Sequence, residues 1–433
     1  MKRKYRFVCV LLALVLAFGI DLPYYRAKNT VKTVSIRHIK LITLQEDTDS
    51  GKIIQDAVKR FQKANKDYDI TVEAVTNDRY KSRMSDYAAT DQIPDVFMTW
   101  TGGTLQDYIS AGLVADLSKF MRQGNYRARF LEKSLRMVSW NNGIWAVPVE
   151  NMTVGLIYYN KSIFHRLHLS PPSTYDQLLK MIPVLRKHGY IPFALANRTA
   201  WSGSMFYMYL VDRLGGPSVF AAAAARKNDG SFANPVFVRA GAMIQQLVRL
   251  GAFPNTFNYQ DEDAGYAREL MYKGSTAMSL SGSWFSMYVK CEDSGFEKNL
   301  GVFPFPVVPG GRGNKNDLIG SLGDNFYAIS SGCRYKDKAF ELIRYLIDDT
   351  AVQQRVQIGE IPPVKNVKLT DPLVLKCFRY VLKAPNVQFW YDQFLPPRLA
   401  NRYLTLNRSL FGGADPEKTA RAMEASARDY YKR

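Results

Sequence analysis

Apolar and polar positions alternate along the first part of the chain in a pattern that predicts strands and helices in turn. Short apolar runs at 39–44 and 69–75 predict strands, and 94–100 predicts a third strand that ends at an aromatic residue. Between them, apolar residues at helical spacing predict one helix capped by Ser50 and another over about 78–89. This alternation is typical of an α/β fold with a mostly parallel sheet.

The same alternation starts again in the middle of the chain. Strands are expected at 154–160 and 191–196 with a helix over 174–189 between them, and long helical segments follow at 205–214 and 235–250. A chain of 433 residues is long enough for two or three hydrophobic cores, so we expect two lobes of similar architecture. No short-period repeat is visible, which argues against a solenoid.

A Pro- and Gly-rich segment at 301–320 predicts two edge strands around an exposed turn. Its Gly-Gly-Arg-Gly run neither follows a strand nor opens a helix, which argues against a phosphate-binding loop. Helices are expected again at 336–347 and 349–357. Because no long linker separates the two halves, the lobes must share several short crossings.

The first residues have the pattern of an export signal. Four basic residues among the first six precede an apolar run at 7–20, which is too short to span a bilayer comfortably. We expect residues 1–29 to be a signal peptide or signal anchor, and the rest of the chain to lie outside the cytoplasm.

Cysteine usage is sparse. Cys9 lies within the apolar run, and Cys291, Cys333 and Cys377 are widely spaced in the remainder of the chain. Three cysteines permit at most one disulfide, and three buried thiols are the favoured interpretation.

The chain is strongly basic, with a formal net charge of +19, of which +15 remains when the four basic residues of the leader are removed. Lysines and arginines are scattered over predicted helix faces, which favours a solvated surface; an acidic ligand or nucleic acid is the alternative. No compact basic block interleaved with aromatic residues occurs, so we do not expect nucleic acid to bind.

Catalytic and metal-binding motifs are missing from the sequence. The close pair His165 and His168 has no carboxylate or cysteine companion, so we interpret it as structural and expect no metal and no cofactor. We expect no enzyme activity, although paired carboxylates for glycoside hydrolysis stay open because their spacing is spatial.

The tryptophans carry the clearest chemical signal. In a parallel sheet, ligands bind at the carboxyl ends of strands, where Glu46 and Trp100 follow two of the predicted strands. Trp100, Trp201, Trp284 and Trp390 each lie at the end of an element beside small or polar residues, whereas a core tryptophan normally lies among aliphatic residues. Local packing at turns would explain any one of them, but four favour a shared aromatic site, which suits the apolar face of a sugar ring.

With these residues in view, the chain resembles the extracellular solute-binding proteins of family 1, the maltose-binding-protein-like sugar receptors of ABC transporters. The resemblance covers nearly all of the chain after the leader. It is carried by the segments AVKRFQKAN, IPDVFMTW, GIWAVPVENMTVGLIYYNKSIF, AMSLSGSWF, LGVFPFPVVPGG, IGSLGDNFYAIS, AFELIRYLIDD, AVQQRVQIGEIPPVK and APNVQFWYDQFLPP.

The resemblance implies a periplasmic-binding-protein-like fold, in which two discontinuous α/β lobes joined by a hinge enclose the ligand. The N-terminal lobe would comprise 30–150 and 301–348, and the C-terminal lobe 151–300 and 349–433. The ligand-binding residues that it implies are Glu46, Trp100, Glu150, Trp201, Trp284, Asp324, Trp390 and Asp392.

The function that the resemblance implies is that of a monomeric receptor, which binds a mono- or oligosaccharide and delivers it to the permease subunits of an ABC importer. A sugar-sensing or cell-surface polysaccharide-binding receptor without transport is the alternative. No cysteine follows the apolar run, so the lipoprotein anchor common in Gram-positive members of this family is missing. The sequence leaves open which sugar binds and how the protein is retained.

Overall fold

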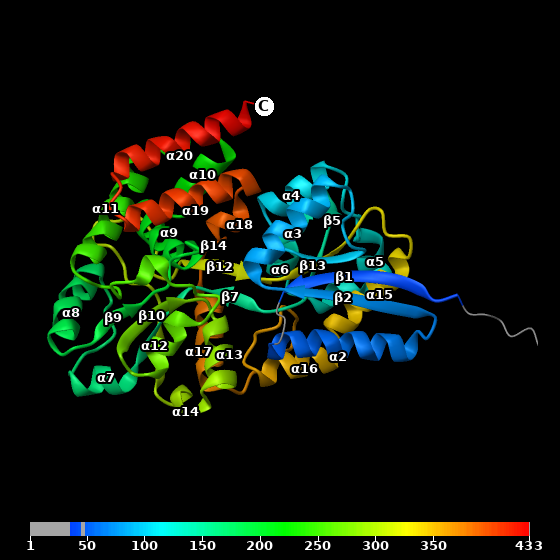
Figure 1. Ribbon diagram of the computed structural model, residues 1–433, viewed down its shortest axis with the longest axis horizontal. Coiled ribbons are helices and arrows are strands. Elements are labelled where there is room, and N and C mark those ends of the chain that lie inside the picture. Colours follow the sequence, from blue (N-terminus) through cyan, green and yellow to red (C-terminus); the bar gives the residue numbers. More distant parts are fainter. Residues whose placement is uncertain (1–34, 45–47, 433) are drawn as a thin grey trace, which may run out of the picture. The chain divides into compact units, whose positions relative to one another are not determined.

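The computed structural model describes residues 35–44 and 48–432, and everything below concerns the compact unit from Arg37 onward (Figure 1). The predicted signal peptide at 1–29, with Cys9 inside it, lies outside the described residues, and so does Glu46. Within the described residues, no helix is both long enough and apolar enough to cross a membrane.

Five strands form the first sheet, in the order β2 (Tyr68–Val75), β1 (Arg37–Leu44), β3 (Val96–Thr99), β13 (Phe326–Ile329) and β6 (Val147–Pro148). Strand β1 runs parallel to β2 and β3, whereas β13 is antiparallel to β3 and β6. Helices lie on both sides of this sheet (Figure 1): α2 (Asp49–Ala64) and α15 (Lys336–Leu346) on one, α3 (Asn77–Ala89) and α4 (Gly103–Ser110) on the other. The alternating elements predicted for the first part of the chain are confirmed.

The start of α2 differs from the prediction by two residues. Thr48, in an extended backbone conformation, is the N-cap, and its hydroxyl accepts a hydrogen bond of 3.0 Å from the Gly51 N–H. The predicted cap, Ser50, lies instead in the first turn of the helix, where it is buried and donates to Glu360. The helical pattern thus located the helix, but not which hydroxyl caps it.

Two further sheets form the other part of the unit. The four-stranded sheet has the order β11 (Leu300–Phe303), β8 (Leu156–Asn160), β10 (Thr276–Ser281) and β9 (Ile191–Ala194), and the three-stranded sheet has the order β14 (Val387–Gln388), β12 (Leu318–Leu322) and β7 (Met152–Val154). The predicted strand at 154–160 is therefore two strands in different sheets. They separate at Gly155, whose N–H donates to the Ile319 carbonyl at 2.8 Å.

The Pro- and Gly-rich segment forms β11, the expected edge strand, and β12. The second edge strand predicted here is wrong, because β12 pairs with β7 on one side and with β14 on the other.

Helices surround these two sheets, and those predicted from apolar spacing are confirmed. The larger ones are α8 (Tyr175–Lys187), α9 (Trp201–Gly215), α10 (Ser218–Ala225), α11 (Pro235–Arg249), α13 (Trp284–Glu292), α17 (Pro372–Lys383), α19 (Pro397–Phe411) and α20 (Pro416–Tyr431). The remaining elements are α5 (Ser118–Arg122), η1 (Gln123–Arg129), α6 (Glu132–Met137), β4 (Ser139–Trp140), β5 (Gly143–Ile144), α7 (Lys161–Arg166), η2 (Phe257–Tyr259), α12 (Tyr266–Tyr272), α14 (Ser294–Glu297), α16 (Asp349–Gln357) and α18 (Tyr391–Phe394).

The apolar core is divided in a way that bears on the predicted lobe boundaries. One cluster surrounds the five-stranded sheet and includes Val364, and another surrounds the four-stranded sheet and includes Phe303 and Ile319. The predicted return to the N-terminal lobe at residue 301 does not match this packing, because β11 and β12 pair with strands of the second part. The division into lobes stays a prediction, and the pairings favour a return to the first part near residue 323, between β12 and β13.

The three cysteines in the described residues are all free. Cys333 and Cys377 are buried, as expected, but Cys291 is exposed, so the prediction of three buried thiols is wrong for Cys291. Cys291 is on α13, a helix whose buried residues occupy its other face.

A buried polar cluster lies where the sheets meet. Arg355 and Glu360 form an ion pair of 2.9 Å whose side chains are 0% and 2% exposed. Beside it, Glu150 accepts hydrogen bonds from the Asn325 amide at 2.7 Å and the Tyr327 hydroxyl at 2.8 Å. Burial raises the pKa of Glu150, the positive charge of Arg355 lowers it, and the negative charge of Glu360 raises it further. The cluster ties the end of β6 to β13 and α16.

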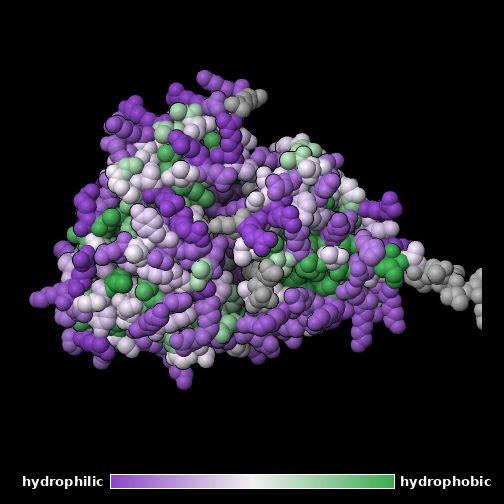
Figure 2. Space-filling view, in the orientation of Figure 1, coloured by the Kyte–Doolittle hydropathy of each residue, from purple (hydrophilic) through white to green (hydrophobic). Residues whose placement is uncertain are grey.

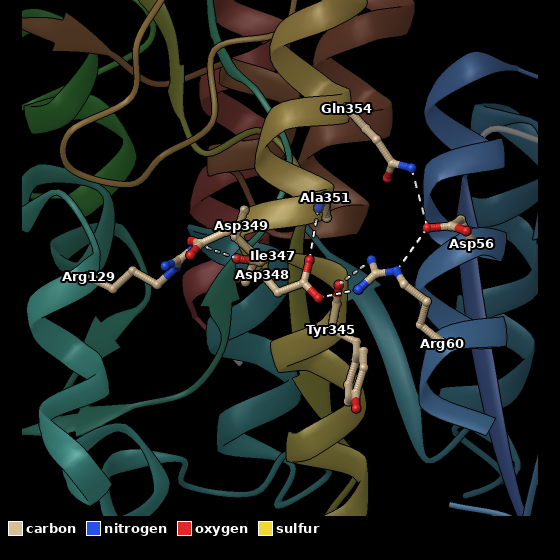
Figure 3. A network of polar contacts seen from close by, with 9 residues as sticks. All are labelled: Asp56, Arg60, Arg129, Tyr345, Ile347, Asp348, Asp349, Ala351 and Gln354. Atoms are coloured by element: carbon tan, nitrogen blue, oxygen red, sulfur yellow. Dashed lines mark hydrogen bonds and ion pairs between the residues drawn. The ribbon is translucent and has the colours of Figure 1, made fainter. Parts of the chain in front are cut away.

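The start of α16 is held by a second polar network (Figure 3). Asp348 caps the helix by accepting from a backbone N–H at 2.8 Å, and it also contacts Arg60 of α2. Arg60 in turn donates to Asp56 at 2.9 Å, and Arg129 pairs with Asp349 at 2.7 Å. These contacts fasten α16, and with it Arg355, to the five-stranded sheet.

The buried ion pair leads to a stability prediction. Replacing Arg355 by Met leaves the Glu360 carboxylate buried without its partner, which we expect to lower the free energy of unfolding by about 3–5 kcal/mol. The measurement is the urea concentration at half-unfolding. The matched control is Arg421→Met, which breaks a pair of 2.6 Å with Glu417 on the exposed face of α20 and should cost less than about 1 kcal/mol. Similar losses in the two variants would contradict the assignment.

Candidate ligand-binding site

A cavity of about 280 Å³ lies between the carboxyl end of the five-stranded sheet and the helices of the second part of the unit. Its walls come from segments far apart in the sequence, including the end of β3, the crossing after β6, the starts of α9 and α13, and the segment around α18. Seven of the eight residues predicted from the sequence line it, and the eighth, Glu46, lies outside the described residues. The seven are Trp100, Glu150, Trp201, Trp284, Asp324, Trp390 and Asp392.

Three of the tryptophans form a continuous row. The ring centroids of Trp201 and Trp284 are 5.8 Å apart, and those of Trp284 and Trp390 are 5.7 Å apart. Trp201 and Trp284 are partly exposed, whereas Trp390 is only 5% exposed. Each precedes or begins a helix, so an irregular backbone just before the helix directs the ring. The row presents an aromatic surface to the cavity.

The stretch around Trp390 serves both the core and the cavity. Tyr391 is buried and stacks on Phe220 at a centroid distance of 3.4 Å, while Trp390, Asp392 and Gln393 line the cavity. The buried tyrosine anchors the segment, and its neighbours face the open space.

Trp100 lines the same cavity from the end of β3. Its ring packs edge-on against Tyr80 at 5.5 Å, and the ammonium of Lys81 lies 5.5 Å from its ring centroid. Lys81 also pairs with Asp392 at 3.7 Å, so an ion pair joins α3 of the first part to α18 of the second. The same pair also borders a neighbouring cavity of about 360 Å³ between α3, α4 and α19.

Asp324 supplies a buried carboxyl group. Its Oδ1 atom has no hydrogen-bond partner among the described residues. Burial raises the pKa of Asp324 to about 7, and the negative charges of Glu150 and Asp392 act in the same direction. An oxygen in this position can accept a hydrogen bond from a ligand.

The sequence interpretation missed a second group of polar residues in the cavity wall, which includes Glu262 and Arg268. A Glu262 oxygen lies 3.9 Å from an Arg268 nitrogen, and the Arg268 guanidinium also donates to Glu292 at 3.0 and 3.1 Å and lies over the Tyr288 ring at 4.0 Å. Burial raises the pKa of Glu262 to about 8, although Arg268 opposes this. The sequence feature that could have indicated this group is the acidic run at 261–263, which lies between two predicted elements.

Comparison with known proteins identifies the class. The bacterial extracellular solute-binding protein family matches residues 45–353, which is more than half of the chain. The chain therefore belongs to this family, and both the predicted resemblance and the predicted two-lobe α/β fold class are confirmed.

The chain is also similar to three individual proteins. It is 26% identical to an extracellular-binding protein of an ABC transporter from Pyrococcus horikoshii over 49% of this chain and 47% of the relative. It is 27% identical to the multiple sugar-binding protein of Streptococcus mutans over 53% of each chain. It is 22% identical to the melibiose/raffinose/stachyose-binding protein MelE of Bacillus subtilis over 93% of this chain and 88% of the relative. The chain thus spans about half the length of the first two relatives.

Solved structures share the fold. A protein from work on xylan utilization by Caldanaerobius polysaccharolyticus has a TM-score of 0.82 and 24% identity, over 90% of this chain and 99% of that one. A chitin oligosaccharide binding protein also has a TM-score of 0.82, with 20% identity, over 91% and 99% of the two chains. The relatives are binding proteins rather than enzymes.

The buried Glu262 gives a prediction for pH dependence. Because its pKa is raised from 4.5 to about 8, the folded state binds this proton more tightly than the unfolded state, so its contribution to stability falls as pH rises through that range. We expect Glu262→Gln, which stays neutral, to gain in melting temperature relative to the parent protein between pH 5 and pH 8.5. The gain should correspond to at least about 1.4 kcal/mol.

The control for this measurement is Glu269→Gln, on the helix α12 that follows Glu262 in the chain, where Glu269 is exposed and paired with Lys273 at 2.9 Å. Its melting temperature should run parallel to that of the parent across the range. Parallel curves for Glu262→Gln as well would show that the Glu262 carboxyl group is not shifted.

Proposed function

We propose that this protein binds a mono- or oligosaccharide in the cavity between its two lobes, by aromatic stacking and hydrogen bonding, and delivers it to the permease subunits of an ABC importer. The observation that carries the proposal is the row of Trp201, Trp284 and Trp390, which lines, together with carboxyl groups, a cavity built from both parts of the chain. The proposed ligand residues are these three with Trp100, Glu150, Asp324 and Asp392, and Glu46 stays a prediction.

The chemistry of the walls suits a sugar. A pyranose ring presents an apolar face of C–H groups that packs on an indole, while its hydroxyls need fixed hydrogen-bond partners around the edge. Hydrogen bonds to charged groups contribute about 1.5–3 kcal/mol each, so carboxylates at the rim of an aromatic platform suit a polyhydroxylated ligand. The unpartnered Asp324 Oδ1 is one such acceptor.

The relatives support the same ligand class. Two that match this chain are named for binding sugars, and one solved structure of this fold is a RafE protein in complex with raffinose, with a TM-score of 0.69. Their names do not identify the sugar of this protein, so raffinose, stachyose, melibiose, xylo-oligosaccharides and chito-oligosaccharides form the first panel to test.

Closure around the ligand follows from where the residues lie. Trp100 and Lys81 belong to the first part of the unit, and Trp390 and Asp392 to the second. A sugar that contacts both sides favours the closed arrangement by its differential affinity for it, which is a shift of population between two states. Location outside the cytoplasm, a monomeric state and the permease partner belong to the same proposal.

The aromatic platform is tested with Trp284→Ala. Removing this partly exposed ring should weaken binding of the best sugar in the panel about tenfold, or about 1.4 kcal/mol, in titration calorimetry. The matched control is Trp140→Ala, which removes a 37% exposed ring in a hairpin outside the cavity and should leave the affinity unchanged. Unchanged affinity in both variants would contradict the proposed platform. Trp390 is a poorer choice, because it is buried and its loss would also lower stability.

The carboxylate at the cavity wall is tested with Asp392→Asn. This change keeps the shape but removes the charge, so we expect about tenfold weaker sugar binding. The free energy of unfolding should change by less than about 1 kcal/mol, because the Lys81 pair is long and partly exposed. A large loss of stability with unchanged affinity would assign Asp392 to the fold rather than to the ligand.

Delivery to a permease is a separate step with its own test. Permease subunits should copurify with the protein in a sugar-dependent manner, since only the closed form presents both lobes together. Sugar binding without such copurification would favour the sensing or surface-binding alternative.

A further inference from the structure

The lining of the cavity holds more acidic than basic residues, whereas the chain as a whole is basic. The full chain carries +19, and hydrophilic residues cover most of the face seen in Figure 2. Among the described residues that line the cavity, only Lys81 and Arg268 are basic, whereas six are acidic. The acidic residues are Glu150, Glu262, Asp263, Asp324, Glu360 and Asp392.

The positive groups at the cavity are already engaged by the protein. Lys81 lies 3.7 Å from Asp392, and Arg268 lies 3.9 Å from Glu262 while it donates twice to Glu292. Arg355, which lies behind the wall, pairs with Glu360. Glu292 and the six lining acidic residues make seven acidic groups in and around the wall. Only three basic groups, Lys81, Arg268 and Arg355, accompany them.

Two of the acidic side chains also hold buried oxygens without partners. Glu262 Oε2 and Asp324 Oδ1 have no hydrogen-bond partner among the described residues. A buried acceptor without a donor is costly, and it becomes less costly when a ligand hydroxyl or ammonium group donates to it. The wall therefore offers acceptors for donors that the protein does not supply.

Resting on the proposed function, we propose that the cavity selects neutral and amine-bearing glycans and rejects glycans that carry a carboxylate. A ligand carboxylate would lie beside the carboxyl groups of the wall. The nearby positive side chains already pair with protein carboxylates, and like charges repel strongly where water is excluded. A ligand ammonium group would meet the unpartnered acceptors instead. The basic surface does not reverse this preference, because exposed charges are screened within about 10 Å at 0.1 M salt.

The test uses three matched probes: raffinose, and two derivatives changed only at C6 of its galactose, one to a carboxylate and one to an amine. Affinities are measured by calorimetry at pH 8.5 in 0.15 M salt, above the raised pKa values of Asp324 (about 7) and Glu262 (about 8), so that both carboxyl groups are mostly ionised. We expect the carboxylate derivative to bind at least tenfold more weakly than raffinose, and the amine derivative to bind equally well or more tightly. Where raffinose itself does not bind, the same two derivatives are made of the neutral member of the panel that does.

A double variant connects the preference to the wall. Glu262→Gln with Asp324→Asn removes the charges of the two carboxyl groups that each carry an oxygen without a partner, and should reduce the ratio of neutral to carboxylate affinity at least threefold. Glu269→Gln removes an exposed acidic residue on α12, outside the cavity, and should leave the ratio unchanged.

The outcomes separate this inference from the proposed function. A carboxylate derivative that binds within threefold of the neutral sugar, or more tightly, overturns the inference while the receptor function stands. A ratio that does not change in the double variant also overturns it, because the discrimination would then come from elsewhere. If no neutral, amine-bearing or acidic sugar in the panel binds at all, the proposed function itself fails.

Discussion

The buried ion pair between Arg355 and Glu360 is the interaction on which the rest of the structure depends. Neither side chain reaches water, so each charge is tolerable only because the other lies 2.9 Å away. Glu150 lies beside the pair and is held by Asn325, just before β13, and by Tyr327 within β13, the strand that returns to the first sheet. The cluster therefore joins the crossing after β6, the strand β13 and the helix α16 at the base of the cavity.

The walls of the cavity above this cluster come from segments that lie far apart in the sequence. Trp201 and Trp284 begin helices, and Trp390 follows a short strand, yet their rings form one row. The stretch around Trp390 shows how a single segment does two tasks: the buried Tyr391 packs against Phe220, and this fixes the neighbours that line the cavity. Rigid packing behind the wall gives the aromatic platform its shape.

Acidic and basic residues are unevenly distributed over the molecule. Its basic surplus is a property of the whole chain, whereas the cavity gathers carboxyl groups in a setting where burial raises the pKa values of Asp324 and Glu262. Net charge alone made an acidic ligand a reasonable alternative, and the charges that a ligand would meet argue for the opposite. What matters for recognition is the charge within a few ångströms in a site that excludes water.

The sequence by itself determined the α/β elements, the family and most of the tryptophans and carboxylates that line the cavity, because apolar periodicity and the polar neighbours of a tryptophan are local properties. The tertiary structure alone decided which sheet β11 and β12 join, that Thr48 rather than Ser50 caps α2, and that Cys291 is exposed. It alone also brought Glu262 and Arg268 into the wall, since a short acidic run between two elements looks the same whether it faces solvent or a cavity. Local patterns state what a segment can form, but strand partners and burial depend on contacts between segments far apart in the chain, such as β8 and β11.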